Sequence, residues 1–145
     1  ELFHQSALLF IFIYASSPSW FFLPNEIFTV PAYALGINPF HIIIAVGLGG
    51  FAGDTLLFHF AHHFHNFYKK KKHSLTNINH WLVKYKELIF IISPSAFFGL
   101  GDAIVILGGL RHIHYITIAP YLLIGNFVRG IWGMTLVILG ISLFN

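Results

Sequence analysis

Four ionisable side chains lie inside segments of the sequence that are otherwise almost entirely apolar: Glu26, Asp54, Asp102 and Arg129. A charged group at the bilayer centre costs about 2.5–3.5 kcal/mol on insertion scales, so four unpaired groups would cost on the order of 10 kcal/mol. Such groups face the protein interior, pair with one another or hold a proton. The residue types therefore predict a polar cavity in which carboxyl groups can take up protons.

A purely structural role explains the same residues without any chemistry. An ion pair of Arg129 with Asp54 or with Asp102 would fix the packing of two helices, because buried pairs can serve helix register alone. The side chains by themselves leave both interpretations open.

Histidines form a second candidate site near the end of the first long apolar stretch. Three of them are spaced i, i+3 and i+4, so their imidazoles share one face of a helix. A zinc site needs three or four converging ligands, and no HExxH signature is present. We favour interfacial histidines near the end of a span and expect neither a metal nor a cofactor. The residues concerned are His59, His62, His63, His65, His112 and His114.

The composition indicates a membrane protein. Of 145 residues, 57% are hydrophobic and 9% are charged, which is too little charge to cover a soluble domain. Phe40–Phe64 and Ile116–Phe144 are each long enough to cross about 30 Å of hydrocarbon as a helix. We predict an all-α integral membrane protein forming a single membrane domain over residues 1–145.

The sequence repeats itself under one shift, which carries Ser17 onto Ser93 and which we call the repeat offset. It aligns Ser17–Phe22 with Ser93–Phe98, and nine of the 35 positions from 17 to 51 are identical to their counterparts. The same offset places Glu26 on Asp102, which favours a functional site over a lone ion pair. We expect one repeat over about 1–65, a basic connection over 66–80 and a second repeat over about 81–145.

Each repeat has the same plan of a short apolar segment, a Ser-Pro-Ser break, an acidic stretch and a long helix. Leu8–Ala15 is too short to span, and proline disfavours helix continuation at the breaks. These features predict a re-entrant hairpin plus one transmembrane helix per repeat. Because each half would cross the membrane once, the second half would have the opposite orientation to the first. The repeats should therefore be inverted, as in many transporters. The alternative is four plain transmembrane helices with kinks at the prolines.

Basic residues are concentrated on one predicted face. Seven of the eight cations fall in the connection and the second hairpin turn: Lys69–Lys72, Lys84, Lys86 and Arg111. Beside membrane helices such a run indicates orientation rather than nucleic-acid binding, so this face should be cytoplasmic.

Several short motifs resemble one family of membrane proteins. Pro24-Asn25-Glu26 followed by Gly49-Gly50-Phe51-Ala52-Gly53-Asp54 is similar to the P-x-E … G-x-x-x-G-D pattern of the DedA (SNARE-associated, VTT-domain) family. Ser93-Pro94, Gly101-Asp102 and Gly108-Gly109-Leu110-Arg111 look more like its small YqaA-type branch. The resemblance covers roughly residues 17–140.

The resemblance implies two re-entrant hairpins in inverted repeats and a role in lipid translocation, driven in some members by protons. It implies that Glu26 and Asp54 are the membrane acids of the pattern. The arginines typical of the second hairpin are absent here, where Asp102 stands, so Arg111 and Arg129 are the arginines left to bind a phosphate.

We therefore expect a transporter or scramblase of lipid or lipid-phosphate type in the bacterial inner membrane, and not an enzyme. Its substrate and proton site would comprise Glu26, Asp54, Asp102, Arg129 and Arg111. Membrane lipids are the expected partners, with a homo-oligomer or a larger membrane complex as further associations. A non-transporting structural subunit is the alternative from a different functional class.

Overall fold

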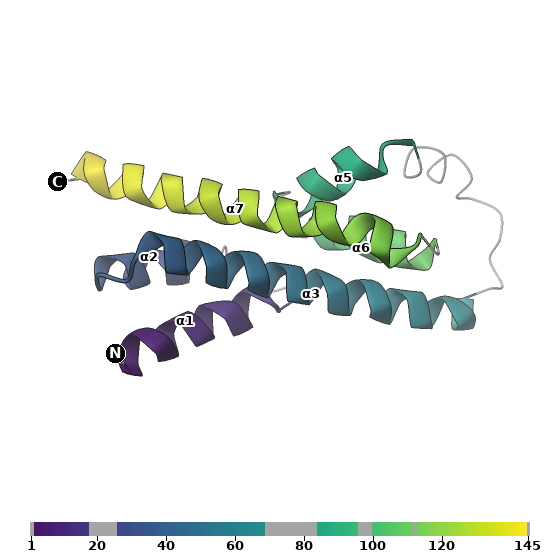
Figure 1. Cartoon of the computed structure of the whole chain (residues 1–145), viewed down its shortest axis with the longest axis horizontal. Coiled ribbons are helices and arrows are strands. Elements are labelled where there is room, and N and C mark those ends of the chain that lie inside the picture. The colour runs from purple at the N-terminus through teal and green to yellow at the C-terminus, as the bar shows by residue number, and fades with distance from the viewer. Residues whose placement is uncertain (1, 18–25, 69–83, 96–99, 112, 145) are drawn as a thin grey trace.

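Two long antiparallel helices form the centre of the molecule (Figure 1). The structure is a computed structural model that describes residues 2–17, 26–68, 84–95, 100–111 and 113–144. The long helices are α3 (Pro39–Tyr68) and α7 (Tyr115–Phe144), each of 30 residues. Gly47 of α3 packs against Phe127 of α7, and Ile43 packs against Gly130. Later residues of α3 thus contact earlier residues of α7, as antiparallel packing requires.

Shorter helices surround this pair. They are α1 (Leu2–Ala15), α2 (Glu26–Ala34), α5 (Lys86–Ile92) and α6 (Leu100–Leu110), with a short 3-10 turn η1 (Ser93–Ser95) after α5. The part of the chain that the structure describes therefore contains six α-helices and no strand. The predicted all-α class is confirmed.

The turn between α2 and α3 shows how the local sequence sets the helix ends. Gly36 has φ +83°, a conformation that glycine adopts without steric cost, and it ends α2. The Asn38 side chain then accepts a hydrogen bond from the Phe40 backbone N–H at 2.9 Å, which caps the start of α3. Pro39 is the first residue of α3, where its missing N–H costs nothing.

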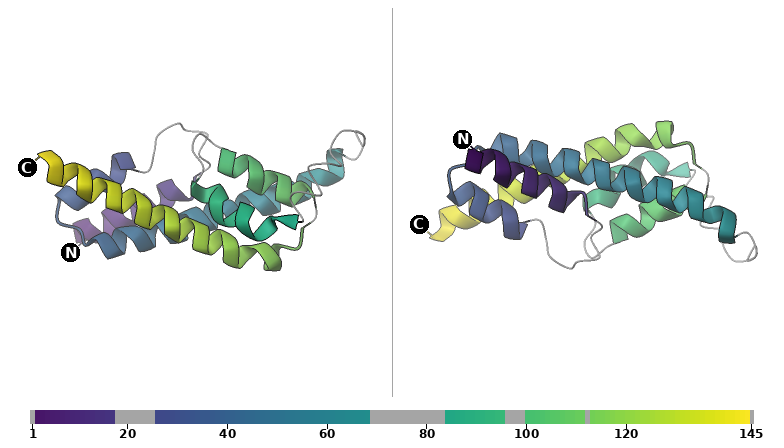
Figure 2. Two further views of the ribbon diagram at one scale, coloured as in Figure 1. Left: turned by 90° about the horizontal axis from the view of Figure 1, so that it is seen from above. Right: turned by 90° about the horizontal axis from the view of Figure 1, so that it is seen from below.

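The first pair of short helices lies on one half of α3. Two glycines of α3 approach the end of α1 closely: a Cβ at Gly49 would lie 2.5 Å from the Phe12 carbonyl oxygen, and one at Gly53 would lie 2.5 Å from the Ser16 carbonyl oxygen. The ring of Phe28 on α2 packs at a tilt of 58° against Tyr14 of α1, with centroids 4.3 Å apart. Both short helices lie in the half of the molecule that holds the two chain ends (Figure 2).

The second pair lies on the other half. Gly125, near the middle of α7, packs against the Ile91 carbonyl oxygen and against Pro94 at the end of α5. Gly109, near the end of α6, packs against the Phe58 carbonyl oxygen in the second half of α3. Glycine spacing of this kind lets helix backbones approach closely.

Each half has its own apolar core. The first core combines the start of α3 with the end of α7, and its buried members are Ile11, Ala32, Ile37, Ile42, Ala45, Val46, Met134 and Val137. The second combines the end of α3 with the start of α7, and its buried members are Phe58, Phe90, Val105, Ile118 and Leu122.

The two long helices have the length and composition of membrane spans over Pro39–Phe64 and Tyr115–Gly140. Only 33% of the apolar stretch that defines each candidate span is buried inside the structure. The remaining surface is largely apolar, with exposed Leu56, Phe60, Ile124 and Ile131 among others. The two predicted apolar stretches are thus confirmed as long helices. The predicted connection 66–80 lies mostly outside the described residues.

Replacing Gly49 with alanine should destabilise the fold. The new Cβ would meet a backbone oxygen of α1 rather than a flexible side chain, so we expect a loss of about 1–3 kcal/mol in the free energy of unfolding. Gly140→Ala is the matched control, because no atom lies within 4 Å of its Cβ position. Thermal unfolding in detergent, followed by circular dichroism, measures both variants. Equal midpoints for the two would contradict the close packing.

Candidate functional site

A partly buried hydrogen bond joins the two long helices through polar side chains. The Asn126 Nδ2 group of α7 donates to Asp54 Oδ2 of α3 at 2.7 Å. The same amide nitrogen donates to the Leu122 carbonyl oxygen at 2.9 Å. Asn126 is 1% exposed, so water does not compete for its side chain. The amide thus gives the carboxyl group a hydrogen-bond partner on the opposite helix.

Glycine makes this contact sterically possible. The Asn126 side-chain oxygen lies where a Cβ on Gly50 would be, so any larger residue at position 50 would displace the amide. Gly50 and Asn126 lie near the midpoints of the two candidate spans, Pro39–Phe64 and Tyr115–Gly140. The polar contact therefore lies at the depth where an unpartnered carboxylate is most costly.

Two further charged residues lie near this hydrogen bond. Asp54 interacts electrostatically with both Asp102 and Arg129. Asp102 occupies the first turn of α6, where the helix dipole favours a negative charge. Arg129 lies on α7 and also interacts with Tyr14 of α1. The structure thus brings together three of the five residues predicted for the site, and they come from α3, α6 and α7.

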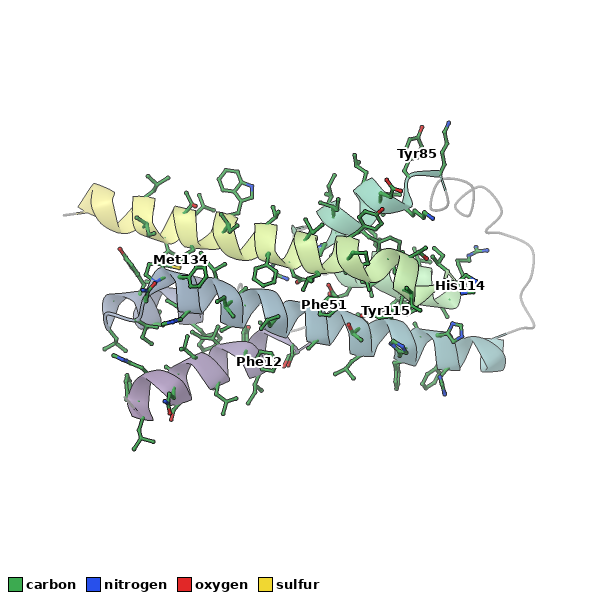
Figure 3. All side chains as sticks on the ribbon, viewed as in Figure 1. Phe12, Phe51, Tyr85, His114, Tyr115 and Met134 are labelled. Atoms are coloured by element: carbon green, nitrogen blue, oxygen red, sulfur yellow. The ribbon has the colours of Figure 1, made fainter. Side chains whose placement is uncertain are left out.

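A small pocket opens beside Arg129 between α2, α3 and α7. Its wall combines Arg129 with apolar side chains and Thr29 of α2, which is 6% exposed. Met134, which also lines the pocket, points from α7 toward α3 (Figure 3). A guanidinium in such a wall can hold an anionic group, while the neighbouring carboxyl groups can hold a proton or a cation.

The remaining two predicted residues are placed differently. Glu26 is the first residue of α2, and its side chain lies outside the described residues. Arg111 directly follows α6, whereas Asp102 lies near its start. The two are nine positions apart, which is about 13.5 Å of helical rise. Arg111 therefore lies toward the end of the molecule and not in the central group.

The histidines of α3 lie near that same end. His59 Nδ1 lies 2.8 Å from the Thr55 carbonyl oxygen, and its ring packs on Tyr115 of α7 with centroids 4.8 Å apart. The Tyr115 hydroxyl lies 2.5 Å from Thr55 Oγ1, which itself donates to the Phe51 carbonyl oxygen. Tyr115 therefore donates to Thr55 and ties α7 to α3 (Figure 3).

No metal site is apparent in the ranges that the structure describes. There, no group of three or more His, Asp or Glu side chains lies close enough to hold a metal ion. The side chain of His65 and the whole of His112 fall outside the described residues.

Asn126 is the site residue that sequence reasoning missed. A search for ionisable groups in apolar segments passes over a neutral amide, because asparagine carries no charge to explain. One signal could have found it: position 126 is the counterpart of Gly50 under the repeat offset. If a twofold axis related α3 to α7, a residue close to that axis would lie opposite its own counterpart. Gly50 and Asn126 would then mark the point where the two helices cross.

Comparison of the chain with family models, with curated proteins and with solved structures finds no match. The function is therefore inferred from the geometry of the described residues.

The Asp54–Asn126 hydrogen bond should show energetic coupling in a double-mutant cycle. Asn126→Leu leaves the carboxyl group without its donor and should cost about 1–3 kcal/mol of stability. The double variant with Asp54→Leu should cost less than the sum of the two single variants, by about 0.5–3 kcal/mol.

Thr135→Val provides the control for this cycle. Thr135 lies on the exposed side of α7, and its hydroxyl donates to the Ile131 carbonyl oxygen at 2.8 Å. Its effect should add to that of Asp54→Leu without coupling. Unfolding in detergent measures all the variants, and additive costs for Asp54 and Asn126 would show that the hydrogen bond contributes nothing.

Proposed function

We propose that this chain is a membrane transporter or scramblase for a lipid or lipid-phosphate substrate, with the central polar group lining the substrate path. One observation carries the proposal: a carboxylate–amide hydrogen bond lies midway along two candidate spans, and its carboxylate, Asp54, interacts electrostatically with Asp102 and Arg129. Membrane helices hold such groups where they line a path for ions or polar substrates.

An inverted-repeat architecture is part of the proposal. The buried cores support it, because positions related by the repeat offset fall into opposite cores. A twofold axis in the membrane plane that exchanged α3 with α7 would also exchange the cores. Three such pairs are Ile42 and Ile118, Val46 and Leu122, and Phe58 and Met134.

Two re-entrant hairpins complete the proposed architecture. The end of α1 contacts α3 no further than Gly53, near the middle of that helix, and α2 then leads back to the start of α3. The end of α5 contacts the middle of α7 at Gly125 in the same way, and α6 leads back to the start of α7. The ends of α1 and α5 thus lie near the level of Asp54 and Asn126, which supports the proposal because discontinuous helices form substrate sites in transporters.

The residue roles follow from their chemistry. Arg129, in the wall of the pocket, would contact the anionic headgroup during passage. Asp54, Asp102 and Glu26 would bind the proton that couples transport, as the resemblance to the DedA family also implies. Arg111, near the end of the molecule, would meet the headgroup at the predicted cytoplasmic face.

Cysteine labelling tests the inverted topology directly, because the natural sequence contains no cysteine. Asn38→Cys and His114→Cys place single thiols at exposed turns before α3 and before α7. With two re-entrant hairpins the thiols lie on opposite faces, so an impermeant maleimide added to intact cells labels only position 38. Four plain spans would place both thiols on one face and give equal labelling.

Substitutions at the central group should slow lipid translocation without loss of folding. In proteoliposomes carrying a fluorescent phospholipid, dithionite quenching measures how fast lipid crosses the bilayer. We expect Asp54→Asn, Asp102→Asn and Arg129→Gln each to lower the rate at least about tenfold, because the path loses a charge at its centre.

Glu87→Gln is the matched control, since it neutralises an exposed carboxylate of α5 away from this group. It should translocate lipid at the wild-type rate. Unchanged rates in all the central variants would rule out the proposed path. A purified wild-type chain that moves no lipid, and that co-purifies stoichiometrically with other membrane proteins, would instead indicate a structural subunit.

A further inference from the structure

Positive and imidazole side chains from four parts of the chain gather at the end of the molecule away from the termini. Tyr85, which lies between Lys84 and Lys86, and His114 both lie at this end (Figure 3). We call this set the basic end. Its members are His59 and His63 of α3, Lys84 and Lys86 at the start of α5, Arg111 after α6 and His114 before α7.

The basic end is polar and accessible, and its formal charge is positive. His59, His63, Lys84 and His114 are exposed. Among the described residues, α5 also brings one carboxylate to this end, Glu87, which interacts with Tyr121 of α7. In contrast, the described residues at the opposite end, 2–17, 27–53 and 130–144, carry no charged side chain at all.

The lengths of the candidate spans place these groups at the level of lipid headgroups. A helix of 26 residues is about 39 Å long, whereas the hydrocarbon layer is about 30 Å thick. With the spans centred on the bilayer, about three residues of each extend beyond the hydrocarbon at either end. His63 and His114 then lie at the depth of lipid phosphates, and His59 lies one turn deeper.

An apolar stripe runs beside the imidazoles on α3. Leu56, Phe60 and Phe64 are spaced by four residues and are all exposed, and the two phenyl rings pack 4.5 Å apart. His59 and His63 occupy the adjacent face at the same spacing. A surface that offers acyl-chain contacts and positive charge side by side fits a phospholipid, whereas a nucleic acid or an acidic protein would use only the charge.

We infer that the basic end binds anionic phospholipid headgroups of the adjoining leaflet, and binds them more strongly as the pH falls from about 8 to about 5.5. Imidazole groups gain positive charge over this range, whereas lysine and arginine keep theirs. Among the described residues, the other titratable groups at this end are His62 of α3, Tyr85 before α5, Glu87 of α5, and Tyr115 and Tyr121 of α7. The inference requires that the chain lies in a membrane, but not that it transports lipid.

Spin-labelled lipids test the inference in phosphatidylcholine proteoliposomes of the full chain. Electron paramagnetic resonance gives the association of labelled phosphatidylglycerol relative to labelled phosphatidylcholine. We expect this ratio to exceed one at about pH 8 and to rise about threefold at about pH 5.5, since each charge near an anionic surface adds a several-fold preference. An unchanged ratio at the two pH values would overturn the pH dependence.

Matched variants locate the effect. Replacing His59, His63 and His114 together with glutamine should reduce the rise while keeping the preference at about pH 8. The control replaces His4 and His41, which are exposed at the opposite end, and should keep the full rise.

Lys84→Gln with Lys86→Gln should lower the preference at both pH values. Equal behaviour of the two histidine variants, or an unaltered preference in the lysine variant, would exclude this surface and leave the charges as an orientation signal only.

Discussion

The whole arrangement depends on how a carboxylate is held between two apolar helices. Asp54 would be unstable in such a segment without a partner, and Asn126 supplies one from the opposite helix at 2.7 Å. The amide is oriented in turn by its second bond to the Leu122 carbonyl oxygen. The hydrogen bond therefore fixes the rotation of α3 relative to α7, and with it the side of each helix that faces the core.

Close packing at glycines makes that arrangement possible. Gly50 leaves room for the Asn126 side chain, and Gly49, Gly53 and Gly125 let the short helices approach the long ones. A methyl group at most of these positions would collide with backbone rather than with a movable side chain. Small residues thus bring the ends of α1 and α5 to the depth at which Asp54 and Asn126 meet.

Positions related by the repeat offset differ in polarity around the central group. Gly50 faces Asn126, while the counterpart of Asp54 is Gly130 in the wall of the pocket beside Arg129. Thr29 is polar where its counterpart Val105 belongs to an apolar core. The two halves therefore contribute different chemistry to the centre.

Composition and apolar length alone determined that the chain is all-α with two long helices, because about 20 consecutive apolar residues leave few other solutions. Charge in apolar segments likewise identified Asp54, Asp102 and Arg129 as residues that need partners. The partner itself came only from the tertiary structure. A neutral asparagine in an apolar helix carries no sequence signal of its own, and helix rotation decides whether it meets a carboxylate or a lipid. The separation of Arg111 from Asp102 was also decided in space, because α6 places them near its opposite ends.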